Sequence, residues 1–80
     1  GMDGFSLILA KAGQEFQATR KMSLERVSYK NGLLDVSLFV ADLQQLDQLK
    51  QRLSDNAKLS VDIHSATAKD NRVEARLRIQ

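Results

Sequence analysis

The sequence predicts a two-layer α+β domain, in which two helices cover one face of a four-stranded antiparallel sheet. Three observations support this fold class. Residues 22–40 and 59–79 each have the apolar and β-branched composition of a hairpin, with turn signals at Asn31-Gly32 and Asp70-Asn71. A helical pattern precedes each hairpin. When the two turns are aligned, the apolar positions around them coincide, so the chain is predicted to contain two copies of one helix–strand–strand unit.

The first unit begins with a helix predicted over residues 4–20. Its apolar stripe follows steps of four, three and four residues, which stack on one helix face: Phe5, Leu9, Ala12 and Phe16. Leu7 lies about 200° around the helix from Phe5 and faces away from this stripe. Leu7 is therefore the first residue expected to contact a partner, although single exposed leucines are also common on monomer surfaces.

The first hairpin contains an irregularity that the second repeats. A type I′ turn at Asn31-Gly32 places Val27 and Tyr29 on the core face, but the alternation then slips by one residue, leaving Leu24 on the wrong side. A β-bulge near Glu25 and Arg26 would return Leu24 to the core. The second hairpin slips in the same way, which predicts a bulge near Ser65.

A second amphipathic helix connects the hairpins. Its leucines recur at steps of three, three and four residues: Leu43, Leu46, Leu49 and Leu53. Asp42 is the expected N-cap, Gln45 completes a capping-box pattern, and Asp55-Asn56 supplies a polar end. The leucine row is too short for a zipper, so it is predicted to face the core.

Short hairpins and a right-handed crossover through this helix favour the sheet order 3-4-2-1. The result is a circularly permuted ferredoxin-like sandwich, αββαββ, with strands one and three at the edges. Residues 4–80 are expected to form this single domain. Because Gly1 precedes Met2, residues 1–3 are expected to be a cleaved-tag remnant or a flexible N-terminus.

The composition excludes several kinds of chemistry. The 80 residues contain no cysteine and one histidine, so no thiol nucleophile, cysteine-ligated metal or histidine-rich metal site can form. Asp35, Asp62 and Glu74 share the open sheet face with Arg76 and Arg78, which is typical of a solvated mixed-charge face. We therefore predict no catalytic residue, no cofactor and no metal, and hence no enzyme.

Nucleic acid is not an expected partner. The net charge is +2 and the basic residues are dispersed. An RNA-recognition sheet stacks bases on aromatic residues, and this open face offers Phe39 alone. Regulatory small-ligand domains of this architecture bring glycine-rich loops that residues 40–42 lack. An RNA- or small-ligand-binding ferredoxin-like domain remains the alternative from a different functional class.

The residues thus favour a protein interaction module. An edge strand has unpaired backbone groups to which another chain can add, and the outer side of the first helix can pack beside it. The candidate interface comprises residues on the first helix and first strand: Leu7, Ala10, Gln14, Arg26 and Ser28.

Two segments carry a family resemblance: LERVSYKNGLLDVSLFVADLQQLDQLKQRL and LSVDIHSATAKDNRVEARLRI. From about Leu9 onward the chain resembles the C-terminal periplasmic domain of the type II secretion system protein L family. The sister M protein and type IV pilus assembly proteins have a similar αββαββ pattern.

This resemblance implies a structural role. Proteins of the L family are inner-membrane proteins, whose cytoplasmic region recruits the secretion ATPase and whose periplasmic domain follows a single transmembrane helix. Here the membrane connection would run only through such a helix, absent from this chain. The resemblance implies a homodimer that also binds the M-protein periplasmic domain, in the platform that assembles the pseudopilus for protein export.

Overall fold

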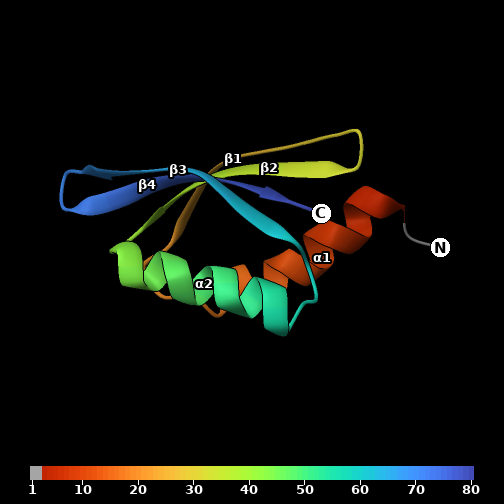
Figure 1. Ribbon diagram of the computed structural model, residues 1–80, viewed down its shortest axis with the longest axis horizontal. Helices are drawn as coiled ribbons and strands as arrows, with labels where there is room; N and C mark the ends of the chain where they lie inside the picture. Colours follow the sequence, from red (N-terminus) through yellow and green to blue (C-terminus); the bar gives the residue numbers. More distant parts are fainter. Residues whose placement is uncertain (1–2) are drawn as a thin grey trace.

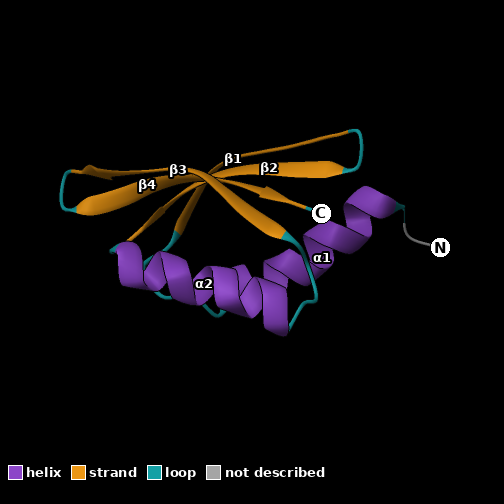
Figure 2. Cartoon of the chain, viewed as in Figure 1, coloured by secondary structure: helices purple, strands orange, loops and turns teal. Residues whose placement is uncertain are grey.

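The computed structural model describes residues 3–80. Two helices and four strands alternate in the predicted order (Figure 1): α1 (Gly4–Gln17), β1 (Ser23–Lys30), β2 (Leu33–Val40), α2 (Leu43–Asp55), β3 (Val61–Lys69) and β4 (Arg72–Ile79). Both helices lie on the same side of the sheet (Figure 2). The predicted two-layer α+β fold is confirmed.

The N-terminal end of the chain is described from Asp3. Gly1 and Met2, on which the expected tag remnant or flexible segment largely falls, lie outside the described residues. The Asp3 side chain accepts a hydrogen bond of 2.7 Å from the Ser6 backbone N–H and caps α1. This bond lowers the pKa of the exposed Asp3 carboxyl, with a further contribution from the Ser6 hydroxyl.

The sheet order is β1-β2-β4-β3, which is the predicted order counted from the other edge. Both outer strands pair with one neighbour, and all ladders are antiparallel. At the centre, Ser37 of β2 pairs with Arg76 of β4. These two positions correspond when the turns of the two units are aligned, so the repeated units meet around the middle of the β2–β4 ladder.

Both hairpin turns have the predicted backbone. Asn31 and Gly32 have φ of 54° and 79°, and Asp70 and Asn71 have φ of 52° and 64°. Positive φ at both central positions gives the twist that matches flanking strands. Each hairpin therefore has a two-residue loop, with Lys30 paired to Leu33 and Lys69 paired to Arg72.

The two predicted bulges are present, but one of their expected consequences is wrong. The register shifts between Leu24 and Arg26 in β1, and between Ile63 and Ser65 in β3. The first bulge turns Leu24 to the helix side, opposite Leu38. However, Leu24 is 47% exposed rather than part of the core, because the helix layer does not cover this portion of the edge strand.

The core lies between the helices and the two central strands. The inner positions of β2 and β4 are buried, among them Leu34, Leu38 and Leu77. The apolar stripe of α1 contributes Ala12 and Phe16 to the core. The helix ends at Gln17, so the prediction that it extends to residue 20 is wrong. There the Thr19 hydroxyl donates to the Glu15 carbonyl, a local side-chain bond of the kind that ends regular helices.

Helix α2 confirms the predicted cap and most of the leucine row. The Asp42 carboxylate accepts from the Gln45 N–H at 2.8 Å, and the Gln45 side chain accepts from the Ala41 N–H at 2.6 Å. Leu46, Leu49 and Leu53 are buried. Leu43 is instead 59% exposed, because its direction lies roughly 90° from the mean of the other three on a regular helix.

Candidate protein interaction surface

Edge strand β1 is exposed along its whole length, including the side that faces the helices. Leu24 is 47% exposed, and Val27 and Tyr29 are each 36% exposed. Helix α1 reaches Tyr29 through Phe5, whose ring centroid lies 5.2 Å from that of Tyr29. Because the remaining apolar side chains of β1 are only partly covered, this strand combines a free backbone edge with apolar surface available to another chain.

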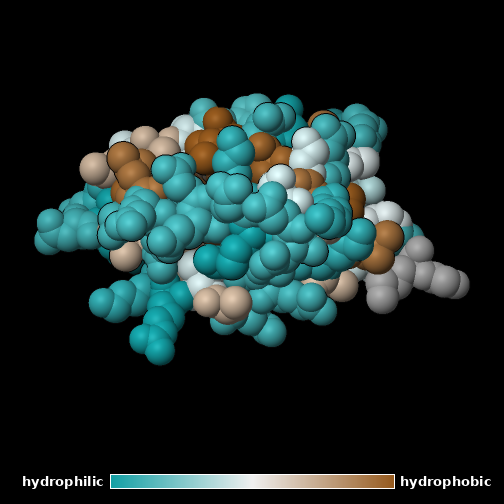
Figure 3. Space-filling model, turned by 60° about the horizontal axis from the view of Figure 1, so that its bottom comes forward, coloured by the Kyte–Doolittle hydropathy of each residue, from teal (hydrophilic) through white to brown (hydrophobic). Residues whose placement is uncertain are grey.

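The outer face of α1 carries three of the predicted interface residues. Leu7 is 45% exposed, and Ala10 and Gln14 are exposed beside it on the same helix side. They point away from buried Ala12 and Phe16, as the spacing predicted. From the helix side, most of the visible surface is hydrophilic, and apolar residues reach it in separate patches (Figure 3).

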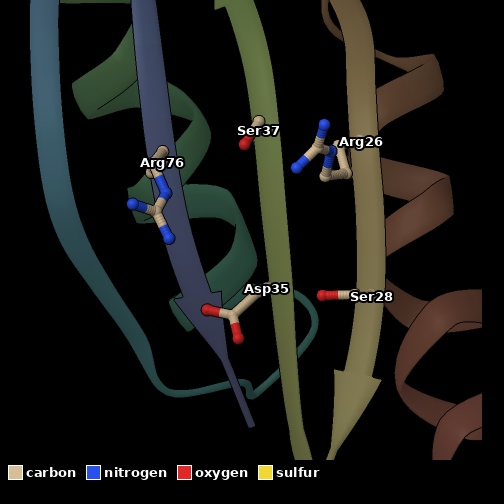
Figure 4. Close-up of a pocket in the computed structure, with 5 residues that line it drawn as sticks. All are labelled: Arg26, Ser28, Asp35, Ser37 and Arg76. Atoms are coloured by element: carbon tan, nitrogen blue, oxygen red, sulfur yellow. The ribbon is translucent and has the colours of Figure 1, made fainter.

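Arg26 and Ser28, the other two predicted interface residues, lie on the opposite face of the sheet. Both line a polar hollow with residues of β2 and β4 (Figure 4). The five predicted residues therefore form two groups, one on α1 and one on the open face of β1, with the strand edge between them. The structure does not bring them together in one patch.

Three apolar residues that border this edge, Leu24, Val27 and Tyr29, were not among the predicted interface residues. The alternation in the strand predicts that Val27 and Tyr29 lie on the core face and that the bulge returns Leu24 to the core, because their parity matches that of buried residues in β2. Parity correctly identifies the face on which they lie. The remaining signal was their position in an edge strand, where one neighbouring strand is absent and coverage depends on the helix.

Two salt bridges join charged side chains of residues 3–80. Asp35 pairs with Arg78 at 3.2 Å on the open face, in agreement with the predicted mixed-charge surface. Glu15 of α1 lies 3.6 Å from the Arg52 guanidinium of α2, which also donates to Thr19 and so links the helices. Within residues 3–80, no group of three or more potential metal ligands occurs.

The surroundings of His64 give no sign of a special role. It is the extra residue at the β3 bulge and its side chain is exposed. In the part of the chain that the structure describes, no helix has the length and apolar character needed to cross a membrane. These features define a class of protein: a small ferredoxin-like domain whose most distinctive surface is an uncovered strand edge.

Two solved structures of other proteins are similar to this chain over most of its length. The chain is similar to the periplasmic domain of XcpY, with a TM-score of 0.85 and 25% identity over 91% of this chain and 95% of that one. It is also similar to the periplasmic domain of EpsL from Vibrio parahaemolyticus, with a TM-score of 0.81. That match has 16% identity and covers 96% of this chain and 92% of the other, and it supports the fold alone.

Both structures are periplasmic domains of type II secretion system L proteins. The resemblance predicted from the sequence is therefore confirmed, as is the expected localisation as a periplasmic domain of a bacterial inner-membrane protein. No protein-family model matches the chain, and no curated protein is a significant sequence match.

Proposed function

We propose that this domain is a non-enzymatic interaction module in the inner-membrane platform of the type II secretion system. In this role it self-associates and binds the periplasmic domain of the M protein, which supports pseudopilus assembly and protein export. In this proposal residues 4–80 form its single domain. The similarity to the XcpY periplasmic domain supports the secretion context.

The observation that carries this proposal is the uncovered edge strand β1. A chain that pairs with this edge would satisfy its free backbone groups and cover Leu24 and Val27 from the helix side. Helix α1 lies on the side of the sheet toward which Leu24 and Val27 point. Its outer face, with Leu7, Ala10 and Gln14, would extend the contact. Arg26 and Ser28 would border the contact on the open face.

The same strand has features that limit indiscriminate pairing. Glu25 bulges out of the ladder, and Arg26 and Lys30 place positive charge along the edge. Charges and bulges on edge strands oppose pairing with arbitrary chains. The partner therefore has to match this pattern, which favours a specific homodimer or a related periplasmic domain over general aggregation.

The proposal is tested by light scattering of the domain alone, followed by titration with the M-protein periplasmic domain. We expect a concentration-dependent dimer and a saturable complex with the M-protein domain. The Leu24→Gln and Val27→Gln double variant should weaken both. A matched control is Leu43→Gln, which changes an equally apolar exposed residue on α2. A strict monomer that ignores the M-protein domain would contradict the proposal.

A further inference from the structure

The open face of the sheet carries a continuous row of four side chains, one from each strand. Arg26 pairs with Ser37, Ser37 with Arg76, and Arg76 with Ser65, so arginine and serine alternate across the sheet. The row passes through the centre around which the two units repeat. The bulges of β1 and β3 adjoin its two ends, and bulges commonly occur where side chains are positioned for function.

Arg26 and Arg76 flank Ser37 across a hollow of about 380 Å³ (Figure 4). Their strands lie two strand spacings apart, which separates their backbones by roughly 10 Å. Among residues 3–80, the salt bridges are Arg52–Glu15 and Arg78–Asp35, so neither flanking arginine is engaged in one. Two guanidinium groups and a hydroxyl are thus available at one place on the face.

This donor set fits a carboxylate. A guanidinium group offers paired N–H donors that match the two oxygens of a carboxylate, and the Ser37 hydroxyl offers another. Phosphate oxygens share this chemistry, but the surroundings disfavour a polyphosphate chain. Asp35 lines the same hollow, and Glu74 lies two residues from Arg76 on the same strand, so closely spaced negative charges would meet repulsion.

The face also lacks a free aromatic platform for nucleic-acid bases. The Arg72 guanidinium lies 4.0 Å from the centre of the Phe39 ring and covers it. Base stacking on single-stranded nucleic acid requires an accessible aromatic face. The open face therefore suits a segment with separated carboxylates, such as an acidic polypeptide, better than a nucleic acid.

We propose that the open sheet face is a second docking surface, which binds an acidic segment of another protein by placing a carboxylate between Arg26 and Arg76 over Ser37. This inference goes beyond the proposed function, which uses the β1 edge and the helix side. Arg26 borders both surfaces, whereas Arg76 lies on central strand β4, two strands away from the β1 edge. Arg76 therefore separates the two surfaces experimentally.

The test is a two-dimensional NMR titration of the folded domain with a short peptide whose glutamates are separated by uncharged residues. We expect amide shifts centred on Arg26, Ser37 and Arg76, and we expect them to disappear at high salt. The Arg26→Gln and Arg76→Gln double variant should bind the peptide roughly tenfold more weakly, since each exposed ion pair supplies a modest part of the affinity. The charge-matched control, Lys11→Gln with Lys50→Gln on the helices, should bind unchanged.

The Arg76→Gln variant should weaken peptide binding without altering the dimer or M-protein binding, so this surface and the edge can fail separately. Equal peptide affinity of the double variant and the domain would overturn the inference, as would peptide shifts confined to the helix layer. Inorganic phosphate or single-stranded RNA that binds the same residues more tightly than the peptide would also overturn the assignment to an acidic protein segment.

Discussion

Replacement of Leu24 by glutamine should weaken self-association of the domain. Leu24 is 47% exposed on the helix side of edge strand β1, so about half of its side chain remains to be buried by a partner. Full burial of a leucine side chain stabilises by about 1.5–3 kcal/mol, so covering the exposed half contributes about 1 kcal/mol. In a symmetric dimer the residue occurs twice, and the loss is about 2 kcal/mol, or roughly thirtyfold in the dissociation constant.

Sedimentation equilibrium over a series of protein concentrations measures this change directly. Thermal unfolding followed by circular dichroism provides the folding control, because an exposed position should tolerate glutamine with little loss of stability. Leu43→Gln is the matched variant, since Leu43 is 59% exposed but lies on α2, away from the edge. If Leu43→Gln weakened the dimer as much as Leu24→Gln, or if Leu24→Gln left it unchanged, the assignment of β1 as the docking edge would be wrong.

Three further predictions concern local structure. Asp42→Ala should destabilise the domain by about 1 kcal/mol in urea unfolding, because the cap of α2 is lost. The control variant Asp47→Ala, on the exposed side of α2, should change stability by less than about 0.5 kcal/mol. Gly32→Ala should lower the free energy of unfolding by about 1 kcal/mol because Gly32 has φ 79°, although nothing lies within 4 Å of an added Cβ. Asn71→Gly should instead raise the free energy of unfolding by up to about 0.5 kcal/mol. If both substitutions changed stability in the same direction, the assignment of the two turns would be wrong. Asp3 has a lowered pKa in the folded state, so its cap stabilises α1 at neutral pH, and this stabilisation is lost as the pH falls through that pKa. In an acid titration followed by NMR, the chemical shift of the Ser6 amide should change with the protonation of Asp3. A Ser6 amide shift that does not change with pH would exclude the cap.

Much of the fold could be predicted because its determinants are local. The turn dipeptides fix which residues pair in each hairpin, and the slip in alternation at Leu24 locates the bulge without any tertiary information. The handedness of the crossover then restricts the strand order. The turns and the bulge depend on a few neighbouring residues, and the strand order depends on the general right-handedness of crossover connections.

The missed features depend on distances that a single sequence does not specify. Strand parity gives the face of Val27 and Tyr29, but not how far α1 extends over that face. Similarly, no turn connects β2 to β4, so the pairing of Ser37 with Arg76 could not be predicted from loop length. The row of arginine and serine on the open face therefore became visible only with the register of the central ladder.

A comparison of the repeated units favours β1 over β3 as the proposed docking edge. Aligning the two turns matches Val27 with Ala66 and Tyr29 with Ala68, so edge strands β1 and β3 have the same backbone irregularity but different side chains. Covering an exposed alanine buries one methyl group at most, whereas a partner at β1 would cover the exposed parts of Leu24 (47%) and of Val27 and Tyr29 (36% each). Backbone pairing would be similar at either edge, so side-chain burial favours addition of a partner at β1.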